Sequence, residues 1–325
     1  MDGAIVVRRV GGPEVLEWSQ VDPGRPGPNE VLVRHTAVGL NFIDVYHRMG
    51  LYPMQLPFSP GVEAAGVVEE VGPGVTDLEP GDRVAYTGNG PAGSYTQRRV
   101  LPRARLFRLP DEIDDETAAA IMLKGCTVEY LVRRTYPVRG GEWVLLHAAA
   151  GGVGLLASQW LAALGAHVIG TAGSEEKAEL ARANGCEHVI LYRTENVAER
   201  VREITGGAGV HVVFDSVGKA TFEGSLDSLR PRGMMVSFGN ASGPVDPVAP
   251  LVLLQKGSLY LTRPTIAHYY ADPSEAADGV AALFDAVVSG RVRPHIGARY
   301  PLAEAARAHE DLEARRTVGS TVLIP

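Results

Sequence analysis

The chain has 325 residues, of which 45% are hydrophobic, 21% are charged and only 6% are aromatic. This composition is typical of a globular protein, and the length suffices for two domains or one large domain. A formal net charge of −7 disfavours nucleic acid or an anionic membrane surface as the main partner.

No apolar run is long enough to span a membrane, and the N-terminus shows no signal-peptide pattern. The two cysteines, Cys126 and Cys186, are too few for a disulfide framework. We therefore expect a cytoplasmic protein in which both cysteines pack as small hydrophobic side chains.

The first third of the chain predicts a β-rich region. Short apolar runs at Ala4–Val7, Val31–Val38, Ala64–Val71 and Arg83–Tyr86 are separated by turn sequences rich in proline and glycine. The pattern changes to helical spacing over Asp114–Arg134. We therefore expect a β-rich lobe that ends in a helix.

From Trp143 onward, buried strands alternate with helices, which predicts parallel βαβ units. The expected strands are Trp143–His147, His167–Thr171, His188–Tyr192, Val210–Asp215, Met234–Phe238 and Leu259–Thr262. The expected helices are Gly154–Leu164, Glu175–Ala183, Val197–Thr205 and Thr221–Leu229. A mixed pattern closes the chain, with helices Pro273–Ser289 and Leu302–Glu313 and strands Ala298–Tyr300 and Ser320–Ile324. We expect an α/β protein in which a dinucleotide-binding domain (124–265) is inserted into a β-rich domain (1–123 and 266–325).

A glycine-rich turn, Ala148–Gly154, joins the first expected strand of the inserted domain to its helix. Gly151 and Gly154 would let the backbone approach a pyrophosphate, and the helix N-terminus would offer free N–H groups. Ala149 replaces the first glycine of the usual fingerprint. The alternative is a tight turn without a ligand, but the strand–turn–helix–strand order favours dinucleotide binding. The expected cofactor-binding residues of the turn are Gly151, Gly152 and Val153.

The end of the next strand bears on the choice between NAD and NADP. An NAD site usually has an acidic residue there, whereas this strand ends in Gly173 and Ser174. Ser174, Lys177 and Tyr192 would suit a 2′-phosphate as hydrogen-bond donors. Alternatively, Ser174 only caps the following helix and Lys177 lies on its solvated face. Spacing alone leaves both nucleotides open.

The order of the two lobes resembles the medium-chain dehydrogenase/reductase superfamily. Its zinc alcohol dehydrogenases carry a glycine-histidine-glutamate string, which here reads Gly61-Val62-Glu63. Asn41, Val62 and Leu123 stand where those enzymes hold zinc ligands. Because a catalytic zinc needs three protein nitrogen, sulfur or oxygen ligands, the resemblance implies that no metal is bound.

Within the superfamily, the chain resembles the zinc-free NADPH:quinone oxidoreductases, the family that includes zeta-crystallin. The resemblance covers essentially the whole chain, with one departure at Ala162, where the family usually has a basic residue. It is carried by Gly11–Val15, Asn41–Tyr46, Leu123–Thr127, Ala148–Gly154, Gln159, Tyr192, Asp215–Gly218, Gly233–Asn240 and Lys256–Pro264.

This resemblance implies a GroES-like catalytic domain with an inserted Rossmann domain, whose parallel sheet is doubly wound, and NADPH as the cofactor. It also implies a homodimer that pairs through the sheet edge near Gly257–Thr262. The expected reaction is hydride transfer from NADPH to a quinone, by positioning and exclusion of water and without an indispensable general acid. The alternatives are an NADPH-dependent reductase of α,β-unsaturated carbonyls, and a crystallin-like NADPH- or RNA-binding protein with little turnover.

Individual residues also receive roles from the resemblance. Asn41, Tyr46 and Tyr52 are expected at the catalytic end of the site, although a turn with a packed tyrosine is the alternative for Asn41–Tyr46. His47 is set aside, because strand-like alternation would direct it away from Tyr46. The implied cofactor-binding residues are Asn41, Phe42, Asp44, Tyr46, Thr127, Tyr130, Gly173, Ser174, Lys177, Tyr192, Val217, Phe238, Gly239, Asn240, Arg263, Pro264 and Thr317.

Overall fold

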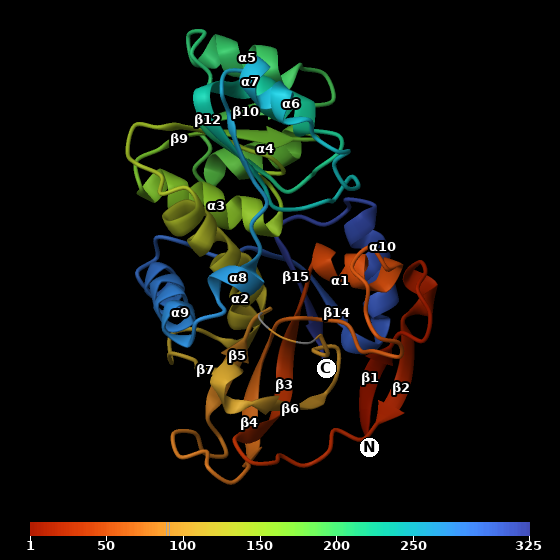
Figure 1. Cartoon of the computed structure of the whole chain (residues 1–325). Helices are drawn as coiled ribbons and strands as arrows, with labels where there is room; N and C mark the ends of the chain where they lie inside the picture. Colours follow the sequence, from red (N-terminus) through yellow and green to blue (C-terminus); the bar gives the residue numbers. More distant parts are fainter. Residues whose placement is uncertain (89, 91) are drawn as a thin grey trace. The chain divides into compact units, whose positions relative to one another are not determined.

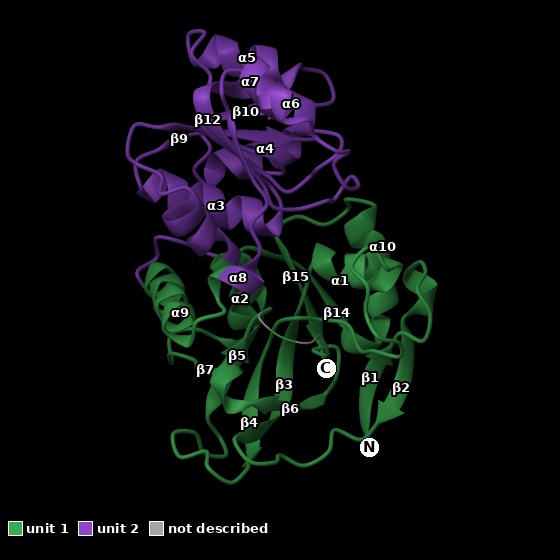
Figure 2. Ribbon diagram, in the orientation of Figure 1, with its two compact units in different colours: residues 1–126, 269–288, 294–325 green, residues 127–268, 289–293 purple. Residues whose placement is uncertain are grey.

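The structure is a computed structural model that describes residues 1–88, 90 and 92–325. The chain divides into two compact units (Figure 2). Unit 1 comprises Met1–Cys126, Tyr269–Val288 and Pro294–Pro325, and unit 2 comprises Thr127–His268 and Ser289–Arg293. Unit 2 is therefore inserted in the sequence of unit 1. No helix in the described part of the chain has the length and apolarity needed to cross a membrane.

Unit 1 is built on a seven-stranded sheet of order β14-β15-β3-β4-β5-β7, in which β6 also pairs with β3 (Figure 1). Its long strand β3 (Glu30–Leu40) pairs with β4 (Ala64–Val71) over almost its whole length. Separate parts of β3 pair with β6 (Arg98–Pro102) and β15 (Ser320–Ile324). The remaining strands are β5 (Arg83–Tyr86), β7 (Phe107–Arg108), β14 (Ile296–Pro301) and the separate antiparallel pair β1 (Asp2–Val6) and β2 (Glu17–Val21).

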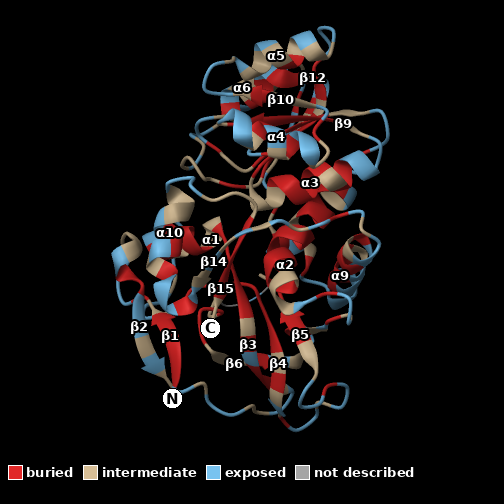
Figure 3. Ribbon diagram, turned by 180° about the vertical axis from the view of Figure 1, so that it is seen from behind, coloured by how far each residue is buried: buried red, intermediate tan, exposed pale blue. Residues whose placement is uncertain are grey.

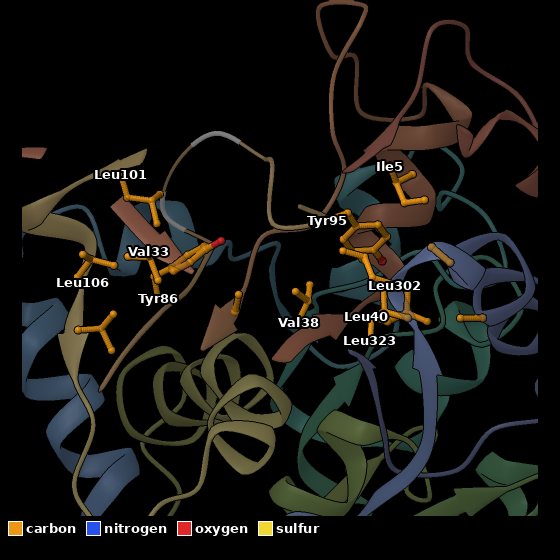
Figure 4. Packing of buried hydrophobic residues seen from close by; sticks show 14 of the residues in the cluster. Ile5, Val33, Val38, Leu40, Tyr86, Tyr95, Leu101, Leu106, Leu302 and Leu323 are labelled. Carbon is orange, nitrogen blue, oxygen red and sulfur yellow. The ribbon is translucent and has the colours of Figure 1, made fainter. Parts of the chain in front are cut away.

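The core of unit 1 is formed by apolar side chains from β1, β3 and the C-terminal segment. Figure 4 shows Tyr95 close to Leu40, Leu302 and Leu323, and all four belong to one buried cluster. The helices of this unit are α1 (Phe42–Met49), α2 (Asp115–Tyr130), α9 (Pro273–Val288) and α10 (Ala305–Glu313). Single 3₁₀ turns lie at Pro13–Val15, Arg103–Arg105 and Leu302–Glu304.

Unit 2 contains a six-stranded, entirely parallel sheet of order β10-β9-β8-β11-β12-β13. The first strand of this unit, β8, lies next to β11, so the strand order reverses at this pair. In doubly wound sheets, ligands bind at the carboxyl ends of the strands beside such a reversal. The strands are β8 (Trp143–Leu146), β9 (His167–Ala172), β10 (His188–Leu191), β11 (Val210–Asp215), β12 (Leu229–Ser237) and β13 (Tyr260–Thr262).

The helices of unit 2 begin with α3, which Figure 3 shows largely buried because its sequence is apolar on nearly every face. They are α3 (Gly152–Ala163), α4 (Glu175–Ala183), α5 (Val197–Ile204), α6 (Phe222–Ser228), α7 (Pro250–Gln255) and α8 (Ile266–Tyr269), whose last residue belongs to unit 1. No helix was predicted between Met234–Phe238 and Leu259–Thr262, but the structure has α7 there, and Pro250 occupies the favourable first position of that helix. The expected helix Asp114–Arg134 instead changes to π-helical geometry over Leu131–Thr135.

Candidate functional site

In unit 2, the glycine turn brings the N-terminus of α3 to the carboxyl end of β8. A Cβ atom on Gly154 would lie 2.3 Å from the Ala148 carbonyl oxygen and 2.7 Å from the Ala149 Cα atom, so only glycine fits. Ala148 itself adopts a left-handed φ of 54°. Gly151 is the N-cap, and the first N–H groups of the helix have no partner within the helix. This close backbone approach is the geometry that a pyrophosphate requires.

A buried hydrogen-bond network behind the turn joins the ends of β8, β9 and β11. His147 lies 3.2 Å from the Thr171 hydroxyl through Nδ1 and 2.9 Å from the Ser225 hydroxyl through Nε2. Ser225 donates to Asp215 at 2.9 Å, and Thr171 accepts from the Ala148 N–H at 3.2 Å. Burial lowers the pKa of His147, which favours the neutral ring that such a chain of donors needs. No role was predicted for His147 from the sequence, although a polar residue that ends an apolar strand is a usable signal.

The loops after β11 and β12 are fastened to each other. Asp215 accepts from the Val217 N–H at 2.8 Å, and its carbonyl accepts from the Phe238 N–H at 2.8 Å. A Cβ on Gly239 would lie 2.4 Å from the carbonyl oxygen of the residue before Val217. The structure thus places four expected cofactor residues, Val217, Phe238, Gly239 and Asn240, in two joined loops. Arg263 and Pro264 follow β13, the next strand of the sheet.

The end of β9 bears on the nucleotide choice. A Cβ on Gly173 would lie 2.5 Å from the Tyr192 hydroxyl oxygen, so this hydroxyl rests against the strand end. Ser174 is the N-cap of α4 and accepts from the Lys177 N–H at 3.4 Å, which is the capping role considered as the alternative. The side chain of Lys177 is half-buried on the first turn. A tyrosine hydroxyl, a lysine and a helix N-terminus therefore lie together without a carboxylate at the strand tip.

In unit 1, the segment that follows β3 is a helix and not the turn considered in the sequence analysis. Asn41 is the N-cap of α1, and its N–H donates to Asp44 Oδ2 at 2.9 Å. The ring of Tyr46 packs edge-to-face against Tyr52 at 5.3 Å and lies 6.3 Å from the ring of Phe42. The structure therefore gathers all five expected residues of this segment around α1.

The prediction that strand-like alternation directs His47 away from Tyr46 was wrong, because both residues lie in the helix α1. The His47 ring lies 6.3 Å from the ring of Tyr52, and its Nδ1 is buried without a hydrogen-bond partner in the described part of the chain. Burial lowers the pKa of His47. This residue thus borders the same cluster through Tyr52.

Asp44 anchors a chain of buried polar groups. Its Oδ2 also accepts from the Tyr95 hydroxyl at 3.1 Å, and that hydroxyl lies 3.0 Å from His309 Nε2. His309 Nδ1 lies 3.1 Å from the Arg48 guanidinium, which binds Glu313 through two nitrogens. Burial raises the pKa of Asp44 to about 7 and lowers that of His309 to about 3. Tyr95 and His309 escaped the sequence analysis, since they are distant in the chain from Asp44.

The three positions that hold zinc in the metal-dependent enzymes lie around a carboxylate. Val62 and Leu123 are buried and apolar, and Asn41 donates through Nδ2 to Glu63 Oε1 at 2.7 Å. Lys124 donates to the same oxygen at 2.9 Å. In the described residues, no group of three or more His, Cys, Asp or Glu side chains is arranged to hold a metal ion.

Three expected cofactor residues lie outside these clusters. Thr127 and Tyr130 stand one turn apart near the end of α2, in the part that belongs to unit 2. Thr317 lies in unit 1, in the segment between α10 and β15. Because Thr321 pairs with Leu40, the start of β15 lies beside the end of β3, from which α1 begins. Thr317 therefore belongs to the same end of the sheet as Asn41.

Two family models match this chain, and both describe the class of protein that the fold indicates. The alcohol dehydrogenase GroES-like domain matches residues 27–111, and the zinc-binding dehydrogenase model matches residues 152–285. Together with the six-stranded Rossmann sheet, these matches place the chain in the medium-chain dehydrogenase/reductase class.

Similar proteins define the family more closely. A quinone oxidoreductase from Pseudomonas aeruginosa is 56% identical over 316 residues, which cover 97% of each chain. A 2-haloacrylate reductase from a Burkholderia species is 49% identical over 329 residues, which cover 99% of this chain and 98% of that protein. The solved structure of Escherichia coli quinone oxidoreductase complexed with NADPH has a TM-score of 0.97 at 48% identity, with 99% of this chain and 100% of that chain covered. The protein belongs to the quinone oxidoreductase family.

Proposed function

We propose that this protein is an enzyme that transfers a hydride from NADPH to a quinone. The observation that carries the proposal is the end of β9, where Tyr192 packs on Gly173 and the strand tip has no carboxylate. Lys177 follows on the first turn of α4, which also carries Glu175 and Glu176. Its relatives named quinone oxidoreductase, one of them complexed with NADPH, support the choice of cofactor and substrate.

The residues of unit 2 fit a phosphorylated dinucleotide. The turn around Gly154 leaves room only for backbone, as a pyrophosphate cradle requires. Gly151, Gly152 and Val153 would hold the pyrophosphate, and Gly173, Ser174, Lys177 and Tyr192 would hold the 2′-phosphate. The joined loops that carry Val217, Phe238, Gly239 and Asn240 would line the rest of the dinucleotide, with Arg263 and Pro264 and with Thr127 and Tyr130 on α2. In unit 1, Thr317 keeps the cofactor-contact role that the resemblance implies.

The residues of unit 1 would position the reacting groups. When bound, NADPH supplies the hydride, and no metal is needed because a reduced quinone stabilises its own negative charge. Asn41 and Asp44 would orient the nicotinamide half, while the paired rings of Tyr46 and Tyr52 exclude water beside it. The proton can come from solvent or from Tyr46, so no side chain is indispensable as an acid.

A substrate panel tests this function. We expect turnover of 1,4-benzoquinone with NADPH, and a kcat/KM for NADH that is lower by roughly 10- to 100-fold, since a charge-assisted hydrogen bond contributes about 1.5–3 kcal/mol. Equal use of NADH would contradict the assignment of the β9 end, and absence of turnover with any quinone would contradict the reaction.

The second candidate function is reduction of an activated carbon–carbon double bond. The 49%-identical relative named 2-haloacrylate reductase favours this candidate. Both reactions use the same hydride donor and differ in the acceptor. Comparing kcat/KM for quinones, enones and 2-haloacrylates at saturating NADPH separates them, with the quinone preferred if the first proposal holds.

We also propose a homodimer that pairs through β13. This strand lies at the edge of the six-stranded sheet, and it exposes Tyr260 and Leu261. Leu251 and Leu254 on the neighbouring α7 are 60% and 65% exposed, which adds to the apolar surface. Light scattering should give the mass of two chains for the wild type and of one chain for Leu261→Lys.

For the cellular location we propose the cytoplasm. Both cysteines are buried and form no disulfide, as is usual in a reducing compartment. Recovery of the native protein in the cytoplasmic fraction after gentle lysis would support this location, and recovery in the periplasmic fraction would contradict it.

A further inference from the structure

Glu63 is a fully buried carboxylate that none of the roles above uses. Its Oε1 accepts from Asn41 Nδ2 at 2.7 Å and from Lys124 Nζ at 2.9 Å, and its Oε2 accepts from the backbone N–H of Leu123. A buried carboxylate is tolerated when a cation and hydrogen bonds compensate its charge. Lys124 is itself only 6% exposed, so the ion pair lies almost entirely out of solvent.

This ion pair lies next to Asn41, Val62 and Leu123, the three positions that correspond to zinc ligands in the metal-dependent enzymes. Glu63 follows Val62, Lys124 follows Leu123, and Asn41 donates directly to Glu63. The Lys124 ammonium supplies the positive charge that compensates Glu63. An ammonium has three donors, and in the described part of the chain Glu63 is the one acceptor that Lys124 contacts.

The carboxylate also determines how the Asn41 side chain is turned. An ionised carboxylate only accepts hydrogen bonds, so the NH₂ group of Asn41 must face Glu63, and its Oδ1 faces the N-terminus of α1, where Asn41 and Asp44 form a capping box. We propose that Glu63 and Lys124 are a positioning pair that fixes the orientation of the Asn41 amide, and through its capping box the start of α1, for contact with the nicotinamide riboside half of the cofactor. This proposal rests on the function proposed above.

The same pair acts on the neighbouring Asp44. Burial raises the pKa of Asp44 to about 7; the negative charge of Glu63 adds to this increase, and the positive charge of Lys124 opposes it. Asp44 Oδ1 is buried without a hydrogen-bond partner among the described residues. The charged and titratable groups around Asp44 are Glu63 before β4, Lys124 on α2, Tyr95 before β6, and, beyond Tyr95, His309 on α10 and Arg48 on α1.

The experiment compares Glu63→Gln, Lys124→Met and the double variant, with two readouts. The first readout is the Kd for NADPH, measured by fluorescence titration. The second is the pKa of Asp44 in the ligand-free protein, measured by ¹³C-carboxyl NMR and assigned with Asp44→Asn. We expect Lys124→Met to raise the pKa of Asp44 and Glu63→Gln to lower it, because each removes one of two opposing charges.

The double variant separates positioning from plain structural support. A glutamine at position 63 can turn either its oxygen or its NH₂ group toward Asn41, so the orientation of Asn41 is no longer determined. We expect the double variant to regain thermal stability relative to Lys124→Met, because no uncompensated charge remains buried. Its Kd for NADPH should stay about tenfold weaker than that of the wild type, as expected for one lost hydrogen bond. Wild-type affinity in the double variant would overturn the proposal.

Two further variants control for loss of folding and for loss of stability. Lys124→Arg retains the positive charge and should leave the pKa of Asp44 near its wild-type value, even if Lys124→Met does not fold. Asp115→Asn breaks another ion pair of α2, between Asp115 and Arg83 at 2.7 Å, and should lower stability without changing either readout. An unchanged Asp44 titration in both Glu63→Gln and Lys124→Met would refute the coupling. Failure of the wild type to bind NADPH would instead refute the proposed function, since the titration uses ligand-free protein.

Discussion

The candidate binding residues of the two units differ in the chemical groups that they offer to a ligand. In unit 2, the surfaces offered to a ligand are mainly backbone, at the glycine turn and at the ends of parallel strands. In unit 1, they are side chains fixed by buried hydrogen bonds, which Glu63 and Asp44 accept from Asn41 and Tyr95. Backbone surfaces recognise what all dinucleotides share, whereas a side-chain network depends on the identity of each residue in it. Substitutions in unit 2 should therefore affect cofactor binding directly. Those in unit 1 should act through the charge state of Asp44 and the orientation of Asn41.

The largest effect is expected from Gly154→Ala in unit 2. Backbone atoms at 2.3 and 2.7 Å from the new Cβ cannot move aside, so the turn must shift. We expect the free energy of unfolding to fall by about 2–3 kcal/mol. Displacement of the phosphate cradle by even 1 Å should weaken NADPH binding by about 100-fold.

Gly224→Ala is the matched control for this change. Gly224 also lies in a helix of unit 2, and a Cβ there meets nothing within 4 Å. This variant should bind NADPH normally and gain about 0.4–1 kcal/mol of stability. Similar losses in both variants, measured by urea denaturation and fluorescence titration, would show that the close approach at Gly154 is not responsible.

The stability of unit 1 should fall in acid, because His35 is buried in its neutral form. Burial lowers the pKa of His35 from 6.5 to about 4, and its Nδ1 lies 2.7 Å from the carbonyl oxygen of Thr96. Because the native protein binds this proton more weakly than the unfolded chain, the contribution of His35 to stability is present above pH 6.5 and is lost as the pH falls toward 4. The loss amounts to roughly 3 kcal/mol at about 1.4 kcal/mol per pKa unit.

Replacing His35 by glutamine should flatten the loss of stability between pH 7 and pH 4, as measured by urea denaturation at each pH. The exposed His268 provides the control, since His268→Gln should keep the wild-type slope. A variant His35→Gln that loses stability on acidification as steeply as the wild type would exclude this histidine as the cause.

In unit 2, Lys177→Met should change the choice of nucleotide more than the reaction. We expect the KM for NADPH to rise by roughly 10- to 100-fold while the KM for NADH stays the same, because only NADPH carries the 2′-phosphate. Arg182→Met removes a cation from the same helix, one that is exposed and paired with Glu175 at 2.6 Å. That control should leave both KM values as they are, and an equal rise for the two nucleotides in Lys177→Met would argue against phosphate recognition.

The smallest effect is expected from Tyr46→Phe in unit 1. The ring contacts with Phe42 and Tyr52 need no hydroxyl, so packing beside the nicotinamide should persist. We expect kcat with 1,4-benzoquinone within about threefold of the wild type, because water can replace a lost donor at small cost. A fall of several orders of magnitude would identify Tyr46 as an essential acid.

Local pattern accounts for much of the agreement between the predicted and observed elements. The strands Val210–Asp215 and Ser320–Ile324 and the helix Glu175–Ala183 are observed with the same bounds. Each has an unbroken apolar pattern or a clear cap, which a short window of sequence contains. By contrast, α1 was not predicted, because Asn41–Tyr46 is too short to display a helical period.

The sequence by itself determined the glycine turn, the parallel strands of unit 2 and the absence of a carboxylate at Gly173 and Ser174, directly after β9, because each depends on neighbouring residues. Only the tertiary structure decided that Glu63 meets Lys124 and Asn41, and that Tyr95 and His309 meet Asp44. These groups are brought together when β3 pairs with β4 and β15, strands that are far apart in the chain. Burial in that sheet then sets their charge states, since the free energy of an ionised group depends on everything that surrounds it.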